Sequence, residues 1–278
     1  MNHLSLFSGI GGLDLGLDRA GMTTVGQVEK DEFCRKVLAK HWPEVPKHDD
    51  VKTFAPWWES APRPTVDLVA GGFPCQGHSV AGLQLGIDDP RWGWPWFRDV
   101  IDHLTETQET PPVVLIENVP NLLRTGFEHV LRDLAERGFD AWWTRLPAAA
   151  VGAPHLRWRL LTVAAHPGRF DGRAWGAWGA VGDRADGSVV APSQLVTGWD
   201  GAVWSLGDTL RPGWRTRPGM GPSTGAAPVG TGGWPAEPDV GRVAYGVPSR
   251  VDRLRGLGNA VVPAVGEWAG RMILDTFG

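Results

Sequence analysis

Cysteine is scarce in this sequence: Cys34 and Cys75 are the two among 278 residues. Two cysteines exclude a disulfide framework, and they lack the paired spacing of a zinc site, so no metal is expected. No apolar run approaches the ~18 residues that a membrane-spanning helix needs. The N-terminus also shows no basic region followed by a long apolar stretch. We therefore expect a soluble protein of the reducing cytoplasm.

Lysine is absent after Lys52, and every later basic residue is arginine. The net charge is −4, yet residues 166–260 carry 10 basic and 8 acidic side chains, so this part is mildly basic. Arginine binds phosphates and guanine edges through paired hydrogen bonds, which would suit a DNA surface. The abundance of Ala, Gly, Pro, Arg and Trp equally fits the codon bias of a GC-rich genome, and both interpretations stay open.

Short apolar segments alternate with amphipathic ones through residues 1–165. This alternation predicts an α/β fold with a doubly wound, mostly parallel sheet, whose ligands bind beyond the carboxyl ends of the strands. The apolar run at residues 160–164 has the composition of a central parallel strand, as do the apolar runs before it. Strands are expected over residues 4–7, 23–29, 66–70, 113–116 and 160–164, and helices over 13–20, 31–40, 96–104 and 127–137.

The composition changes at about His166. Residues 166–235 are rich in Gly, Trp, Pro and Ser and show no helical period, which predicts a small irregular domain. A flexible linker is the alternative, although the repeated tryptophans argue against pure disorder. Residues 236–278 are expected to return to the first domain, with a closing helix over 262–277 that packs on the sheet.

Cys75 lies in the segment GGFPCQGHSVAG, residues 71–82, directly after the expected strand 66–70. A Gly-rich polar loop at a strand end is where α/β proteins carry chemistry rather than packing. The alternative is that Cys75 is a small core hydrophobe, as most free cysteines are. Its loop makes it a candidate nucleophile.

A second Gly-rich loop, FSGIGG at residues 7–12, lies between the first expected strand and helix. Its glycines allow a ligand to approach the helix N-terminus closely, although the spacing is not that of the dinucleotide fingerprint. Glu29 ends the second strand, where an acidic side chain commonly accepts hydrogen bonds from ribose. A solvated helix cap is the other interpretation of Glu29. With Asp50 about twenty residues later, the pattern suggests a nucleoside-containing cofactor.

Charged residues gather around two further strands. PPVVLIENVP delivers Glu117 and Asn118 at a strand's carboxyl end, where a carboxylate could hold a flat heterocycle while a thiolate attacks it. PHLRWRLLTVA places Arg157 and Arg159 on one face of a strand by period-2 alternation. Two guanidiniums would anchor the carboxylate and favour the thiolate of Cys75. A structural salt bridge is the alternative.

These segments resemble the motifs of the C5-cytosine DNA methyltransferases, in that family's order and over nearly the whole chain. LSLFSGIGGLDLGL is similar to the cofactor loop, DLVAGGFPCQGHSVAG to the catalytic loop and VLIENVP to the Glu-Asn-Val motif. PHLRWRL is similar to the Arg-x-Arg motif, and GLGNAVVP, residues 256–263, to the closing cofactor motif. One such match could arise by chance, whereas five in order are specific.

The resemblance implies a Rossmann-like methyltransferase fold that uses S-adenosylmethionine, with residues 166–235 as the target-recognition domain. Cys75 would attack C6 of a cytosine flipped out of double-stranded DNA. Glu117 would hold N3 and the exocyclic amine. Arg159, helped by Arg157, would position the base and that carboxylate. C5 would then take the methyl group, and loss of its proton would expel the cysteine.

The resemblance also implies a cofactor site built from both ends of the chain. Phe7 would pack on the adenine, and Glu29 would bind the ribose. Gln76 and Ser79 are expected to contact DNA. The full set of expected cofactor-binding residues is Phe7, Gly9, Gly11, Gly12, Glu29, Asp50, Val51, Pro74, Asn259 and Val261.

Some residues depart from the family pattern. His78 stands where an aromatic or apolar residue is common, and His155 where glutamine is usual. Residues 91–95, RWGWP, only loosely resemble an Arg-Gly-x-Leu motif that touches the cofactor in the family. Tyr245, the one tyrosine of the chain, has no expected role.

Two other functions stay open. A tRNA cytosine-5 methyltransferase shares the fold and motifs, but residues 166–260 contain no cysteine for the Cys-Phe-Thr signature of that group. A non-catalytic DNA-binding relative is the other, and the presence of Cys75, Glu117 and Arg159 gives no reason to prefer it. We expect a monomer, and a partner restriction endonuclease is left open.

Overall fold

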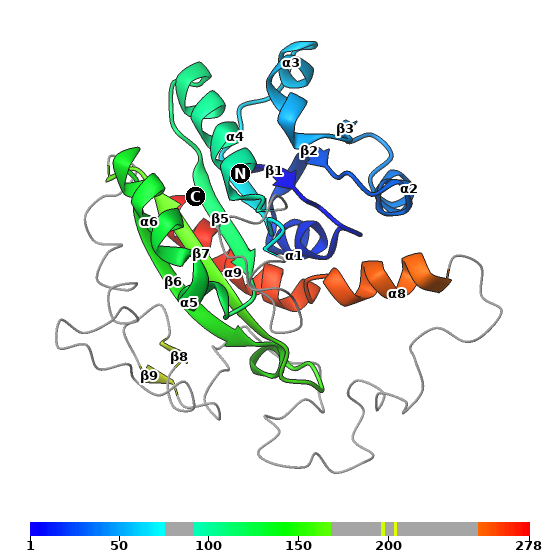
Figure 1. Cartoon of the computed structure of the whole chain (residues 1–278), viewed down its shortest axis with the longest axis vertical. Helices are drawn as coiled ribbons and strands as arrows, with labels where there is room; N and C mark the ends of the chain where they lie inside the picture. The colour runs from blue at the N-terminus through cyan, green and yellow to red at the C-terminus, as the bar shows by residue number, and fades with distance from the viewer. Residues whose placement is uncertain (76–91, 168–195, 198–202, 205–249) are drawn as a thin grey trace.

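The computed structural model describes residues 1–75, 92–167, 196–197, 203–204 and 250–278. Within them, a seven-stranded sheet runs in the order β3-β2-β1-β4-β5-β7-β6 (Figure 1). Its strands are β1 (Asn2–Leu6), β2 (Thr23–Val28), β3 (Lys47–His48), β4 (Leu68–Gly71), β5 (Val113–Asn118), β6 (Asp140–Pro147) and β7 (Trp158–Ala165). A separate two-residue pairing joins β8 (Val196–Thr197) to β9 (Val203–Trp204).

The helices of the described residues alternate with these strands along the chain. They are α1 (Gly12–Ala20), α2 (Glu32–His41), η1 (Val51–Thr53), α3 (Phe54–Glu59), α4 (Trp94–Thr107), α5 (Leu122–Thr125), α6 (Phe127–Glu136), η4 (Ala148–Val151), α8 (Arg250–Asn259) and α9 (Pro263–Phe277). The predicted α/β class and the closing helix are therefore confirmed.

Strand direction departs from the prediction at one place. Strands β1 to β5 pair in parallel, but β7 runs antiparallel to both β5 and β6. The run 160–164, predicted as a central parallel strand, is therefore the antiparallel β7, which begins at Trp158. A strand buried on both faces has the same continuous apolar composition in either direction, so the sequence could not distinguish them.

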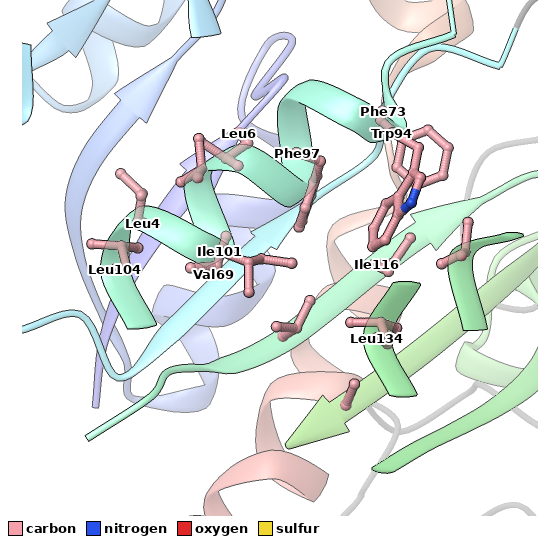
Figure 2. Packing of buried hydrophobic residues seen from close by; sticks show 14 of the residues in the cluster. Leu4, Leu6, Val69, Phe73, Trp94, Phe97, Ile101, Leu104, Ile116 and Leu134 are labelled. Carbon is pink, nitrogen blue, oxygen red and sulfur yellow. The ribbon is translucent and has the colours of Figure 1, made fainter. Parts of the chain in front are cut away.

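Two hydrophobic cores form, one on each face of the sheet. On one face α4 and α6 cover β1, β4 and β5, and Figure 2 shows Phe73, Trp94 and Phe97 packed there. The Phe73 and Trp94 ring centroids are 5.6 Å apart. On the other face α1 and α9 lie side by side over β4, β5 and β7 (Figure 1). The segment 91–95 thus supplies core residues, since Trp92 and Trp94 are both buried.

The ends of two helices follow directly from the local sequence. The Asp31 carboxylate accepts a hydrogen bond from Cys34 N at 2.9 Å and so caps the start of α2. Helix α1 ends at Ala20 and is capped by Gly21, whose φ of 104° lies in the left-handed region that favours glycine. Between these helices β2 carries the chain across the sheet to Glu29. The loops at the carboxyl edge are therefore held by regular structure on both sides.

The structure describes few residues of the predicted second domain. The irregular domain predicted over 166–235 falls almost wholly outside them, as do Gln76, His78, Ser79 and Tyr245. That domain and the DNA-contacting roles stay predictions.

A buried polar pair lies under the first Gly-rich loop. Asp14 and Gln27 are both fully buried, and Gln27 Nε2 donates to Asp14 Oδ1 at 3.0 Å. Among the described residues, Asp14 Oδ2 and Gln27 Oε1 have no hydrogen-bond partner. Burial raises the pKa of Asp14, against smaller lowering effects from His3 and Gln27. A protonated Oδ2 would give Gln27 Oε1 the donor that it lacks.

We expect Asp14→Asn to stabilise the protein at pH 8 by about 1 kcal/mol, because the amide stays neutral and can donate to Gln27. A raised folded-state pKa means that the contribution of Asp14 to stability is present at low pH and is lost as pH rises through that pKa. The advantage of the variant should therefore shrink between pH 8 and pH 5. Urea unfolding at both pH values measures it, and a gap independent of pH would contradict the assignment.

Candidate active site

A cavity of about 500 Å³ opens at the carboxyl ends of the parallel strands, where such folds bind ligands. Its walls come from segments that are distant in sequence. They are the loop after β1, the residues after β2, residues 49–52, the loop after β4, Trp96 of α4, the end of β5, the start of β7 and the end of α8. Apolar side chains and a few charged groups line it together, as is typical of small-molecule sites.

Cys75 lies on the loop after β4 and is half-buried. Its Sγ donates to Asn118 Oδ1 at 2.7 Å, and Asn118 Nδ2 donates to the Phe73 carbonyl at 3.2 Å. Asn118 therefore ties the cysteine loop to the end of β5 at two points. The sequence placed Asn118 at a strand end but assigned it no role. Its position directly after Glu117 was the available signal.

Glu117 is held by an ion pair with Arg159. Arg159 Nε lies 2.6 Å from Glu117 Oε1, and the two side chains are 15% and 10% exposed. Burial raises the pKa of Glu117, while Arg159 first and Arg157 second act to lower it. A Cβ on Gly72 would lie 2.7 Å from Glu117 Oε2, so the loop approaches the carboxylate as closely as glycine permits.

The Cys75 thiol is protonated in this arrangement. Burial, and then the neighbouring Glu117 carboxylate, raise the pKa of Cys75 to about 11. The Val119 N–H and Arg159 act in the opposite direction but do not outweigh them. Arg159 thus favours the thiolate, in the predicted direction, but burial and Glu117 outweigh it, and Arg157 is not among the main groups that shift this pKa.

Arg157 and Arg159 make different close contacts. Arg157 precedes β7 with a φ of 23°, and its guanidinium donates to Gly258 O at 2.7 Å and to Ala260 O at 2.8 Å. The predicted placement of both arginines on one strand face is wrong, because alternation holds only within a strand and Arg157 lies outside β7 with a positive φ. Arg159 forms the ion pair with Glu117, and the charge of Arg157 also acts to lower the pKa of that carboxyl.

The other half of the cavity has the features expected for a nucleoside. Glu29 Oε2 accepts from Gly9 N at 2.7 Å, and Oε1 accepts from Asp31 N at 2.7 Å. Burial raises the pKa of Glu29, and these two backbone donors lower it. Phe7 has a φ of 53° and stacks on Phe97 with ring centroids 6.4 Å apart. The carboxylate is thus fixed beside the Gly-rich loop.

Two neighbouring glycines of that loop differ in role. A Cβ on Gly12 would lie 2.3 Å from Val261 O, so Gly12 lets the C-terminal segment close on the first loop. Gly11, with a φ of 83°, faces Trp42, and a Cβ there would lie 2.5 Å from the ring. Gly11 is absent from the cavity lining among the described residues. Gly11 is thus required for packing against Trp42, and its contact with the cofactor stays a prediction.

Asp50 and Val51 lie at the opposite rim. Asp50 Oδ1 accepts from Lys52 N at 3.1 Å and caps η1. Lys52 Nζ lies 4.2 Å from the centroid of the Trp96 ring, and both side chains line the cavity. The sequence analysis did not predict this pair, because nothing in the sequence distinguishes Trp96 from the other apolar residues of its helix.

The structure thus brings most predicted residues to one cavity. Those that line it are Phe7, Gly9, Gly12, Glu29, Asp50, Val51, Pro74, Cys75, Glu117, Arg159, Asn259 and Val261. Cys34, for which no role was predicted, also lines the cavity. His155 lies half-buried in the turn before Arg157. In the part of the chain that the structure describes, no three His, Cys, Asp or Glu side chains cluster as metal ligands, and no helix could cross a membrane.

Known proteins resemble this chain in sequence and in fold. The family described as "C-5 cytosine-specific DNA methylase" matches residues 1–171. Type II methyltransferase M2.BsuMI of Bacillus subtilis is 38% identical over 168 residues, which are 59% of this chain and 42% of that protein. Type II methyltransferase M.NgoMIV of Neisseria gonorrhoeae is 36% identical over 166 residues, 58% of this chain and 50% of that protein. The chain thus spans half or less of the length of these two relatives.

One solved structure matches nearly the whole chain. The Entamoeba histolytica methyltransferase EhMeth has a TM-score of 0.58 at 16% identity, and the match covers 99% of this chain and 98% of that one. At this identity the likeness concerns the fold alone.

We expect Glu117→Gln to speed alkylation of Cys75 at pH 8, because removing the adjacent negative charge lowers the pKa of the thiol. A change of one pKa unit would give roughly a tenfold faster reaction with iodoacetamide. The measurement uses a Cys34→Ala background, so that Cys75 is the one thiol labelled. Glu128→Gln, on the exposed face of α6, is the matched control. An unchanged or slower rate in Glu117→Gln would contradict the assigned electrostatics.

Proposed function

The chain belongs to the C-5 cytosine-specific DNA methylase family, and we propose that it transfers a methyl group from S-adenosylmethionine to C5 of cytosine in double-stranded DNA. The predicted resemblance to this family is confirmed by the match over residues 1–171. The observation that carries the proposal is that Cys75, Glu117 and Arg159 lie in the same cavity as Glu29 and the first Gly-rich loop.

The catalytic end of the cavity supports attack on a flat base. The Cys75 sulfur would bond to C6 after losing its proton, and C5 would gain the electron density that takes the methyl group. Glu117, with its raised pKa, would give or share a proton at N3 as charge develops there. The Arg159 contact at 2.6 Å would hold the carboxyl in place. Expulsion of sulfur then follows loss of the C5 proton.

The target base must leave the stacked duplex before it can enter the cavity. Atoms C5 and C6 are not accessible inside double-stranded DNA, so the cytosine would be flipped out. The Cys75–Asn118 hydrogen bond would break as the sulfur turns to C6. Asn118 would still hold the loop through the Phe73 carbonyl, which keeps the nucleophile near the base.

The nucleoside end of the cavity fits S-adenosylmethionine. Glu29 is fixed by two backbone donors and retains lone pairs for ribose hydroxyls. A Cβ on Gly9 would meet nothing within 4 Å, so the loop leaves space on its cavity side. Phe7, Val51 and the Lys52–Trp96 pair supply apolar and aromatic surface for an adenine. The bound cofactor would supply the electrophilic methyl group.

The relatives suggest a biological setting. M2.BsuMI and M.NgoMIV are named Type II methyltransferases. We propose that this chain modifies a specific DNA sequence within a restriction-modification system, whose endonuclease would be the functional partner. The target-recognition domain predicted over 166–235, with its arginines, would then read the DNA sequence.

Methylation mapping tests the proposal. We expect that the intact protein, expressed in a host without cytosine methylation, places 5-methylcytosine at one short sequence, and that Cys75→Ala abolishes it because the adduct cannot form. Bisulfite sequencing of the recovered DNA measures both. Glu128→Gln, on the exposed face of α6 and outside the cavity lining, is the matched control and should retain the motif.

Absence of methylation from every sample would reject DNA as the substrate. Purified protein would then be incubated with tRNA and labelled S-adenosylmethionine. Label on cytosine in tRNA would identify the RNA-directed enzyme, and no label on either nucleic acid would identify a non-catalytic relative.

A further inference from the structure

Arg157 joins two segments that are about a hundred residues apart. Its Nη2 atom donates to Gly258 O at 2.7 Å and to Ala260 O at 2.8 Å. Both are short bonds from a charged donor, which are roughly twice as strong as neutral ones. One guanidinium nitrogen therefore fixes the segment that follows α8 to the start of β7.

The two acceptors lie where α8 ends. The last carbonyls of a helix have no partner within the helix, and α8 ends at Asn259. Gly258 O belongs to the last turn, and Ala260 O follows directly. A cation at a helix C-terminus also interacts favourably with the helix dipole. Arg157 thus acts as the C-terminal cap of α8, although it comes from another part of the chain.

The capped segment is a wall of the cavity. Gly256, Gly258, Asn259, Ala260 and Val261 all line it. Val261 O lies so close to Gly12 that a Cβ there would be 2.3 Å from it. A shift of this segment would therefore change the space beside the first Gly-rich loop, where the nucleoside end of the cavity lies.

The same short stretch holds the catalytic carboxylate. Arg159, two residues after Arg157, contacts Glu117 at 2.6 Å. The φ of 23° at Arg157 is a conformation that non-glycine residues rarely adopt, and such strain persists where the surroundings impose it. This backbone conformation separates the directions of the two guanidiniums, so one faces Glu117 and the other the end of α8.

We propose that Arg157 is a positioning residue for the cofactor: it holds the 258–261 wall in the conformation that binds S-adenosylmethionine and couples that wall to the Glu117–Arg159 pair. The proposal rests on the proposed function and deepens it. It assigns the first arginine of the PHLRWRL segment to the cofactor side of the cavity rather than to the base.

The test compares Arg157→Ala, Arg157→Lys and the control Leu156→Ala, which alters a neighbouring side chain that is 63% exposed. Hydrogen exchange in the absence of any ligand reports on the wall itself. We expect Arg157→Ala to speed exchange at residues 256–262 by tenfold or more, while α4 and β5 keep wild-type protection. Leu156→Ala should leave the exchange at 256–262 unchanged.

Titration with S-adenosylhomocysteine, followed by calorimetry, reports on binding without catalysis. Arg157→Ala should weaken binding by roughly 10- to 100-fold, as expected for losing hydrogen bonds from a charged group. Arg157→Lys should recover part of it, since an ammonium can still donate to a carbonyl. In methylation assays the KM for S-adenosylmethionine should rise, with kcat at saturating cofactor within a few-fold of wild type.

Other outcomes overturn the proposal. Wild-type exchange at 256–262 in Arg157→Ala would show that the arginine does not hold the wall. If Arg157→Ala binds S-adenosylhomocysteine as tightly as the wild type but loses kcat, Arg157 positions the target base rather than the cofactor. If the wild-type protein binds no S-adenosylhomocysteine, the proposed function fails and the cofactor role fails with it, whereas the exchange result still decides whether Arg157 holds the wall.

Discussion

The ion pair between Glu117 and Arg159 depends on the reversal of strand direction between β5 and β7, toward one edge of the sheet. Glu117 lies at the carboxyl end of β5, whereas Arg159 lies at the start of β7. These ends meet because β7 is antiparallel to β5, with Leu161 opposite Glu117. In a parallel orientation the start of β7 would lie at the other edge of the sheet, about 20 Å away for strands of this length. The buried carboxylate would then have no cation.

Desolvation explains the charge state of the site. Glu117 and the Cys75 thiol both have raised pKa values, and burial is the largest cause for each. Glu117 is not an isolated charge, because Arg159 lies 2.6 Å from it and offsets part of the cost of burial. Among the described residues Cys75 has no such ion-pair partner, and the Glu117 charge beside it adds to the effect of burial, so the thiol form prevails.

The sequence predicted what depends on local pattern. Alternating segments specified the α/β class, and strand-end placement brought Glu29, Cys75 and Glu117 to one edge without knowledge of the strand order. The direction of β7 was not predictable, because buried strands look alike in either direction. The site prediction itself required the reversal, since two arginines at a strand start reach the carboxyl edge only on an antiparallel strand. Arg157 and Arg159 reach different partners because φ at Arg157 is 23°. An arginine in the sequence gives no sign that its φ is positive.

Helix α9 packs along α1 through small residues, including Gly16 and Gly270, where an added Cβ would meet the facing helix at under 3 Å. This contact delivers the 258–261 segment to the loop after β1, so two walls of the cavity come from regions some 250 residues apart in sequence. During synthesis the first Gly-rich loop leaves the ribosome early, while its opposing wall emerges only after residue 261. The nascent chain can form the parallel part of the sheet, yet it has no enclosed nucleoside site until residues 258–261 have been made.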